Sequence, residues 1–123
     1  MAFAHIALAT RDARRTAQFF EATLGWRPID RPGNIATPAA GLEIAPAQEI
    51  HLLEIADFSP SPFEREYGRH FALTYPRDGF DALKDRLRSL GAEVIPAVRP
   101  TPFDRFFFRS PDGYVFEVIE KND

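Results

Sequence analysis

The sequence predicts an α+β protein built from two β-α-β-β-β modules. The main observation is a weak internal repeat of about half the chain, in which His5-Ile6-Ala7-Leu8 recurs as His70-Phe71-Ala72-Leu73. Each copy then continues into an aspartate, a segment with helical apolar spacing and a Leu-Gly pair. One supersecondary unit is therefore expected twice in the chain, once in each half.

Each module should hold one helix directly after its first strand. Asp12 and Asp78 are suited to cap these helices, because a carboxylate accepts hydrogen bonds from the free N–H groups of the first turn. Gly25 and Gly91 fit the left-handed residue that ends a helix, since glycine has no Cβ to clash there. The apolar positions at helical spacing are Ala13, Ala17, Phe20 and Leu24 in the first helix and Phe80, Leu83, Leu87 and Leu90 in the second.

Short strands are expected after each helix. In the second half, Ala92–Ile95 and Arg105–Arg109 read as strands, and Tyr114–Glu120 closes a hairpin. The turn Ser110–Gly113 supports it, because proline presets φ and glycine supplies positive φ. The strand regions expected in the first half are Trp26–Asp30, about Asn34–Thr37, Glu43–Ala45 and Ile50–Ile55.

The length of the chain fits one domain over residues 1–123. With 45% hydrophobic residues, 123 residues can bury one compact core and are too few for two ordinary domains. The segment 57–66 contains Ser59-Pro60-Ser61-Pro62 and should be a stiff linker, because proline lacks the N–H that a sheet needs. We expect module one to span about 1–57 and module two about 66–120, with an aromatic core or cleft built from the 12 phenylalanines.

Charge and composition exclude several classes of partner. A formal net charge of −3 and a pI of about 5.6 do not provide the positive field that nucleic-acid binding requires. Without cysteine, any metal must be bound by nitrogen and oxygen. The apolar segment 1–10 has no basic flank and is too short for a signal peptide or a membrane span. The expectation is a cytoplasmic protein without nucleic-acid or membrane partners.

Four side chains with metal-binding or acid–base chemistry fall on one predicted face of the strands: His5, His51, His70 and Glu117. The repeat relates His5 to His70 and His51 to Glu117. Their neighbours on that face are small, which leaves room for a ligand in a cleft. We expect a curved mixed sheet around this cleft, with the helices on the outside. The small neighbours are Ala7, Ala9, Ala72 and Thr74.

Imidazole nitrogens with one carboxylate oxygen suit a divalent transition metal such as Zn, Ni, Fe, Mn or Co. The sequence predicts that His5, His70 and Glu117 bind one such ion, whereas His51 is left open as a fourth ligand or an acid–base residue. Scattered arginines, Arg105 and Arg109 among them, could bind a substrate carboxylate or phosphate. On a small domain such arginines are generally solvated, and we expect them to be exposed.

The paired modules, the opening histidine of each and Ser110-Pro111-Asp112-Gly113-Tyr114-Val115-Phe116-Glu117 resemble the vicinal oxygen chelate superfamily. This superfamily contains glyoxalases, bleomycin-resistance proteins and extradiol dioxygenases, and its usual motif is Asp-Pro-Asp-Gly before an apolar strand that bears Glu. The resemblance covers nearly the whole chain and implies metal binding by His5, His70 and Glu117. At the position of His51, glyoxalase I has a carboxylate and methylmalonyl-CoA epimerase a glutamine, so Glu117 is the only carboxylate left on the inner face.

The resemblance implies three alternative functions. The first is a glyoxalase-like lyase or isomerase that works through a metal-chelated enediolate-type intermediate, with Glu117 and His51 as catalytic residues. The second is an extradiol-type ring-cleaving dioxygenase in which His51 serves as the acid–base residue. The third is non-catalytic, a bleomycin-resistance-like protein that binds a small-molecule ligand. In each case we expect a homodimer, the commonest closed assembly.

Overall fold

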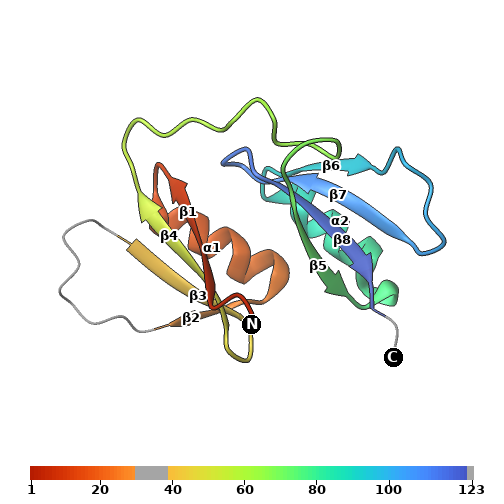
Figure 1. The fold of residues 1–123 in the computed structure, drawn as a ribbon, viewed down its shortest axis with the longest axis horizontal. Helices are drawn as coiled ribbons and strands as arrows, with labels where there is room; N and C mark the ends of the chain where they lie inside the picture. Colours follow the sequence, from red (N-terminus) through yellow and green to blue (C-terminus); the bar gives the residue numbers. More distant parts are fainter. Residues whose placement is uncertain (30–38, 122–123) are drawn as a thin grey trace. The chain divides into compact units, whose positions relative to one another are not determined.

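The computed structural model describes residues 1–29 and 39–121. Over these residues the chain forms two units, Met1–Ser59 and Pro60–Asp123, and the boundary between them lies among the prolines of segment 57–66. Each unit contains one helix and one four-stranded mixed sheet (Figure 1). The predicted α+β class and its two β-α-β-β-β modules are confirmed.

Unit 1 holds the first module. It consists of β1 (His5–Thr10), α1 (Ala13–Leu24), β2 (Arg27–Ile29), β3 (Ala39–Ala45) and β4 (Gln48–Glu54). The strand order is β1-β4-β3-β2, in which β1 and β4 are parallel and the other neighbours antiparallel. The predicted strand at 34–37 lies outside the described residues, as does the end of the one at 26–30.

Unit 2 repeats this arrangement with β5 (Phe71–Tyr75), α2 (Phe80–Ser89), β6 (Glu93–Pro96), β7 (Arg105–Arg109) and β8 (Val115–Glu120). A short 3-10 turn, η1 (Arg77–Gly79), precedes α2. The strand order is β5-β8-β7-β6, with β5 parallel to β8. In both units, therefore, the first strand of the module lies beside its last strand.

The strand register agrees with the sequence repeat. Ala7 on β1 is opposite His51 on β4, and Ala72 on β5 is opposite Glu117 on β8. The two closing positions are therefore equivalent in the two sheets. This register places each opening histidine near the candidate residue of the closing strand.

The helix ends follow local chemistry in three cases of four. Asp12 caps α1, because its Oδ1 accepts a hydrogen bond from the N–H of Arg15 at 3.0 Å. Gly25 ends α1 with a φ of 73°, and Gly91 follows α2 with a φ of 91°. After α2 the N–H of Ala92 donates to the carbonyl of Leu87, closing the left-handed end.

Two predictions at α2 are wrong. Asp78 does not cap the helix, since it lies inside η1, and Gly79 takes the capping position without a side-chain hydrogen bond. Helix α2 begins two residues after Asp78, whereas α1 begins one residue after Asp12. The carboxylate of Asp78 therefore does not stand at the capping position. Leu90, expected on the apolar face, stands beyond the last helical residue Ser89 and is 44% exposed.

The core of each unit is built from apolar side chains of its helix and its strands. In unit 2 the rings of Phe108 and Phe116 stack with 5.1 Å between centroids, and Phe80 of α2 meets Phe106 edge-on. In unit 1, Leu42, Ile50 and Leu52 are buried with Phe20 of α1. No helix among the described residues is long and apolar enough to cross a membrane.

Candidate functional site

His70 and Glu117 meet on the sheet of unit 2. His70 stands directly before β5, and Glu117 is the third residue of the parallel neighbour β8. The Nε2 atom of His70 lies 3.3 Å from Oε1 of Glu117, and the carboxylate side chain is only 9% exposed. The edge of the Phe107 ring packs against the imidazole with 5.1 Å between centroids. Two of the four candidate residues are therefore adjacent and largely withdrawn from solvent.

The other nitrogen of His70 faces a backbone acceptor. Its Nδ1 lies 3.3 Å from the carbonyl oxygen of Arg65. A carbonyl can only accept, so the neutral tautomer with its proton on Nδ1 satisfies this contact and leaves the lone pair on Nε2, the form in which the ring can bind a metal. Metal-binding histidines are oriented by this kind of partner behind the ring.

The loop that supplies this carbonyl is closed by its own contacts. The N–H of Arg69 donates to the carbonyl of Phe63 at 2.8 Å, and Arg69 Nε pairs with Oε2 of the buried Glu64 at 2.9 Å. Gly68 lies so close to Phe63 that a Cβ there would be 2.1 Å from its carbonyl oxygen. The loop thus fixes both Arg65 and the start of β5.

The spacing of the pair fits two ligands of one ion. Donor atoms that each lie about 2.1 Å from a metal are about 3.0 Å apart at a right angle and about 3.4 Å apart at a tetrahedral angle. The observed 3.3 Å between His70 Nε2 and Glu117 Oε1 falls within this range. The nitrogen and oxygen donors also match the preferences of divalent transition metals.

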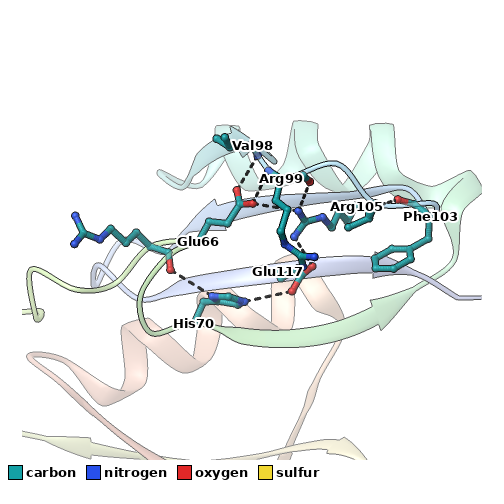
Figure 2. Close-up of polar contacts among 9 residues, drawn as sticks. Glu66, His70, Val98, Arg99, Phe103, Arg105 and Glu117 are labelled. Atoms are coloured by element: carbon teal, nitrogen blue, oxygen red, sulfur yellow. Dashed lines mark hydrogen bonds and ion pairs between the residues drawn. The ribbon is translucent and has the colours of Figure 1, made fainter.

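Arg105 and Glu66 complete a polar chain behind Glu117 (Figure 2). Arg105 on β7 donates from Nη1 to Oε2 of Glu117 at 2.9 Å and from Nη2 to Oε2 of Glu66 at 3.1 Å. Glu66 in turn accepts from the backbone N–H groups of Val98 and Arg99 at 2.8 and 2.9 Å. The expectation of an exposed arginine is wrong for Arg105, whose side chain is 3% exposed.

The charged groups of the polar chain formed by Glu117, Arg105 and Glu66 stabilise one another. Burial opposes the charge of Glu66, but the N–H groups of Val98 and Arg99 and the Arg105 guanidinium outweigh it, so the pKa of Glu66 lies below its ordinary 4.5. Burial likewise opposes the charge of Arg105, yet Glu117 and Glu66 together raise the pKa of its guanidinium. Arg105 is therefore a permanent cation between two carboxylates. Its Nε is buried and has no hydrogen-bond partner among the described residues.

Unit 1 brings together the other two candidates. The rings of His5 and His51 stack with 4.0 Å between centroids and 17° between planes. Nε2 of His51 lies 2.9 Å from Oε1 of Glu49 on the same strand. Because a carboxylate accepts, the neutral His51 ring carries its proton on Nε2 and its lone pair on Nδ1.

The four candidates thus form two pairs, His5 with His51 in unit 1 and His70 with Glu117 in unit 2. Over residues 1–29 and 39–121, no group of three or more His, Asp or Glu side chains is arranged to hold a metal ion. Sequence reasoning missed Glu49, Glu66 and the burial of Arg105. The Glu49–His51 spacing of two on one strand was a usable signal, because such residues share a face.

Comparison with known proteins gives one family and several similar structures. The model of the Glyoxalase/Bleomycin resistance protein/Dioxygenase superfamily matches residues 2–118. No curated protein sequence matches the chain significantly.

The similar solved structures share the fold at low identity. A fosfomycin resistance protein, FosX, from Listeria monocytogenes, an E126Q mutant crystallised with Mn(II) and 1S,2S-dihydroxypropylphosphonic acid, is 21% identical with a TM-score of 0.81. The match covers 98% of this chain and 92% of that one. FosX from Mesorhizobium loti is 18% identical with a TM-score of 0.75, over 98% of this chain and 92% of its own.

A possible glyoxalase from Bacillus cereus is 19% identical with a TM-score of 0.72, and the match covers 97% of this chain and 98% of that one. At these identities the likeness concerns the fold. The family match spans both modules and the terminal Ser110–Glu117 motif. The chain therefore belongs to the Glyoxalase/Bleomycin resistance protein/Dioxygenase superfamily.

Proposed function

We propose that this protein is a metal-dependent enzyme that acts on a small molecule carrying two neighbouring oxygen atoms. His5, His70 and Glu117 would bind one divalent transition metal ion. The observation that carries the proposal is the buried His70–Glu117 pair, whose donor atoms are 3.3 Å apart while Nδ1 of His70 faces a carbonyl. A FosX structure of the same fold contains Mn(II) and a compound with two adjacent hydroxyl groups, which supports this class of chemistry.

When bound, such an ion stabilises negative charge that develops on a substrate oxygen in a water-poor site. The residues of the chain would supply binding and proton transfer. We assign the proton transfer to His51 and Glu117, the two candidates for catalysis. Of these, His51 is the better placed, since Nδ1 is its unprotonated nitrogen and Glu49 fixes the ring from the other side.

The stacking of His5 and His51 argues against a common ion for these two rings. The lone pair of an imidazole lies in the plane of its ring. Two rings that stack with 17° between planes and 4.0 Å between centroids cannot both point their lone pairs at one nearby ion. With His5 as a ligand, His51 is favoured as an acid–base residue. This supports three protein ligands with open positions for substrate, the usual form of a catalytic site.

The reaction we favour is a glyoxalase-like lyase or isomerase reaction. The deciding experiment uses protein purified without a His tag, stripped of metal and reconstituted separately with Zn, Ni, Fe, Mn and Co. Turnover is then measured on a hemithioacetal of a 2-oxoaldehyde, on fosfomycin and on a catechol. We expect about one metal ion per chain and turnover on the hemithioacetal.

Other outcomes identify the alternatives. Oxygen uptake with the catechol, restricted to the iron form, would replace the lyase proposal with a dioxygenase. If the folded protein binds none of these metals, and its intrinsic fluorescence is quenched on titration with bleomycin, a ligand-binding function would replace the lyase proposal.

We also propose that the protein is a homodimer, because the family commonly completes its clefts at subunit contacts and a twofold dimer is the commonest closed assembly. Light scattering at micromolar and higher concentrations should give twice the chain mass. A mass of 13.9 kDa throughout would exclude the dimer.

A further inference from the structure

The two oxygens of the Glu117 carboxylate contact different side chains. Oε2 accepts a hydrogen bond from Nη1 of Arg105 at 2.9 Å, whereas Oε1 lies toward Nε2 of His70 at 3.3 Å (Figure 2). The two oxygens therefore have different surroundings. One is engaged by a fixed cation, and the other faces the histidine that shares the proposed metal.

Arg105 is held more firmly than an ordinary ion pair would require. Its side chain is 3% exposed, and Nη2 donates both to Glu66 and to the carbonyl of Arg99. Glu66 is anchored on the backbone by the N–H groups of Val98 and Arg99. A continuous chain of hydrogen bonds thus runs from the backbone after β6 to Oε2 of Glu117.

A buried ion pair contributes little net stability, because the loss of hydration offsets the attraction between the charges. Stability alone is therefore a weak reason for this network. Its charges suit a cation nearby, since two carboxylates and one guanidinium leave one net negative charge. The negative charge of Glu66 compensates for the positive charge that Arg105 places beside Glu117.

We propose that Arg105, held by Glu66, is a positioning residue that presents Glu117 to the metal through Oε1 alone. The guanidinium keeps Oε2 from becoming a second ligand and from accepting a substrate proton. This inference rests on the proposed function, because it takes Glu117 as a ligand. It narrows the proton transfer, proposed above for His51 and Glu117, to His51 alone and leaves Glu117 the role of a ligand.

The test compares the Co(II) forms of the full chain and its variants by their visible absorption, which reports coordination number, and by competition titration of metal affinity. The variants are Arg105→Lys, which keeps the charge but loses the fork, and Glu66→Gln, which releases Arg105. Arg77→Lys is the matched control, because Arg77 also pairs with two carboxylates, Asp104 and Glu120, and contacts no candidate residue in the described part of the chain. Thermal melts identify variants that fail to fold.

We expect both variants to weaken Co(II) binding about 10- to 100-fold, the usual effect of losing a partner behind a ligand. Their absorption bands should weaken as Glu117 becomes bidentate, and the control should match the wild type. If a folded Arg105→Lys or Glu66→Gln variant has the wild-type spectrum and affinity, the positioning role is overturned while the metal site stands. If the wild-type protein itself binds no metal, the proposed function fails first.

Discussion

Nε2 of His70 lies 3.3 Å from Oε1 of Glu117, although one residue precedes the first strand of unit 2 and the other lies on its last. The parallel pairing of β5 with β8 makes this contact. The same pairing of β1 with β4 brings His51 beside His5 in unit 1. The β-α-β-β-β module thus places its opening histidine next to its closing strand twice.

The first prediction concerns the ligand set. His5→Ala, His70→Ala and Glu117→Ala should each lose the bound metal, because removal of one of three ligands leaves too few donors to hold the ion. Metal content per folded chain, measured by elemental analysis after dialysis, tests this. Glu120→Gln is the control, since Glu120 is a carboxylate on the same strand that pairs with Arg77. A variant that keeps full metal content removes its residue from the set.

The second prediction separates the roles of His51. His51→Ala should retain the metal but lower kcat about 10²- to 10⁴-fold, the range expected for loss of a general acid–base group. Glu49→Gln should lower kcat less, because it removes only the partner of Nε2. Loss of metal from His51→Ala would instead make it a fourth ligand.

The third prediction concerns acid stability. The pKa of Glu66 in the folded protein is below its ordinary 4.5, so its ionised form stabilises the fold above about pH 4.5. This contribution is lost as the pH falls through the folded-state value. Denaturant titrations between about pH 5 and 3 should show a shallower fall in the free energy of unfolding for Glu66→Gln than for the wild type.

Asp85→Asn serves as the control in these titrations, because Asp85 is an exposed carboxylate on α2. It should keep the wild-type slope. If the free energy of unfolding of Glu66→Gln falls with pH as steeply as that of the wild type, ionised Glu66 does not stabilise the folded protein.

The fourth prediction compares the two aspartates of the repeat. Asp12→Ala should lower the free energy of unfolding by about 1 kcal/mol, because it removes a helix cap. Asp78→Ala should change it by less than about 0.5 kcal/mol, as expected for a site without such a contact. Urea unfolding at neutral pH measures both. Equal losses would contradict the difference between the two helix starts.

Sequence alone determined the features that local rules control. The helix ends at Gly25 and Gly91 and the hairpin at Ser110–Gly113 follow from residues that lie close together in the chain. Alternation along strands also predicted that the four candidate residues share one face of the strands. These patterns sufficed for the fold class. They singled out the four candidate residues, but they did not predict that His5 would lie beside His51 and His70 beside Glu117.

Only the tertiary structure decided the partners of the candidate residues. Arg105 looked like a solvated arginine, but the β7–β8 register and the segment at 98–99 place it between Glu66 and Glu117. Asp78 matched Asp12 in the repeat, yet a different backbone turn moved it away from the helix start. Contacts of this kind join distant segments and depend on register and rotamer, which no periodicity in the sequence records.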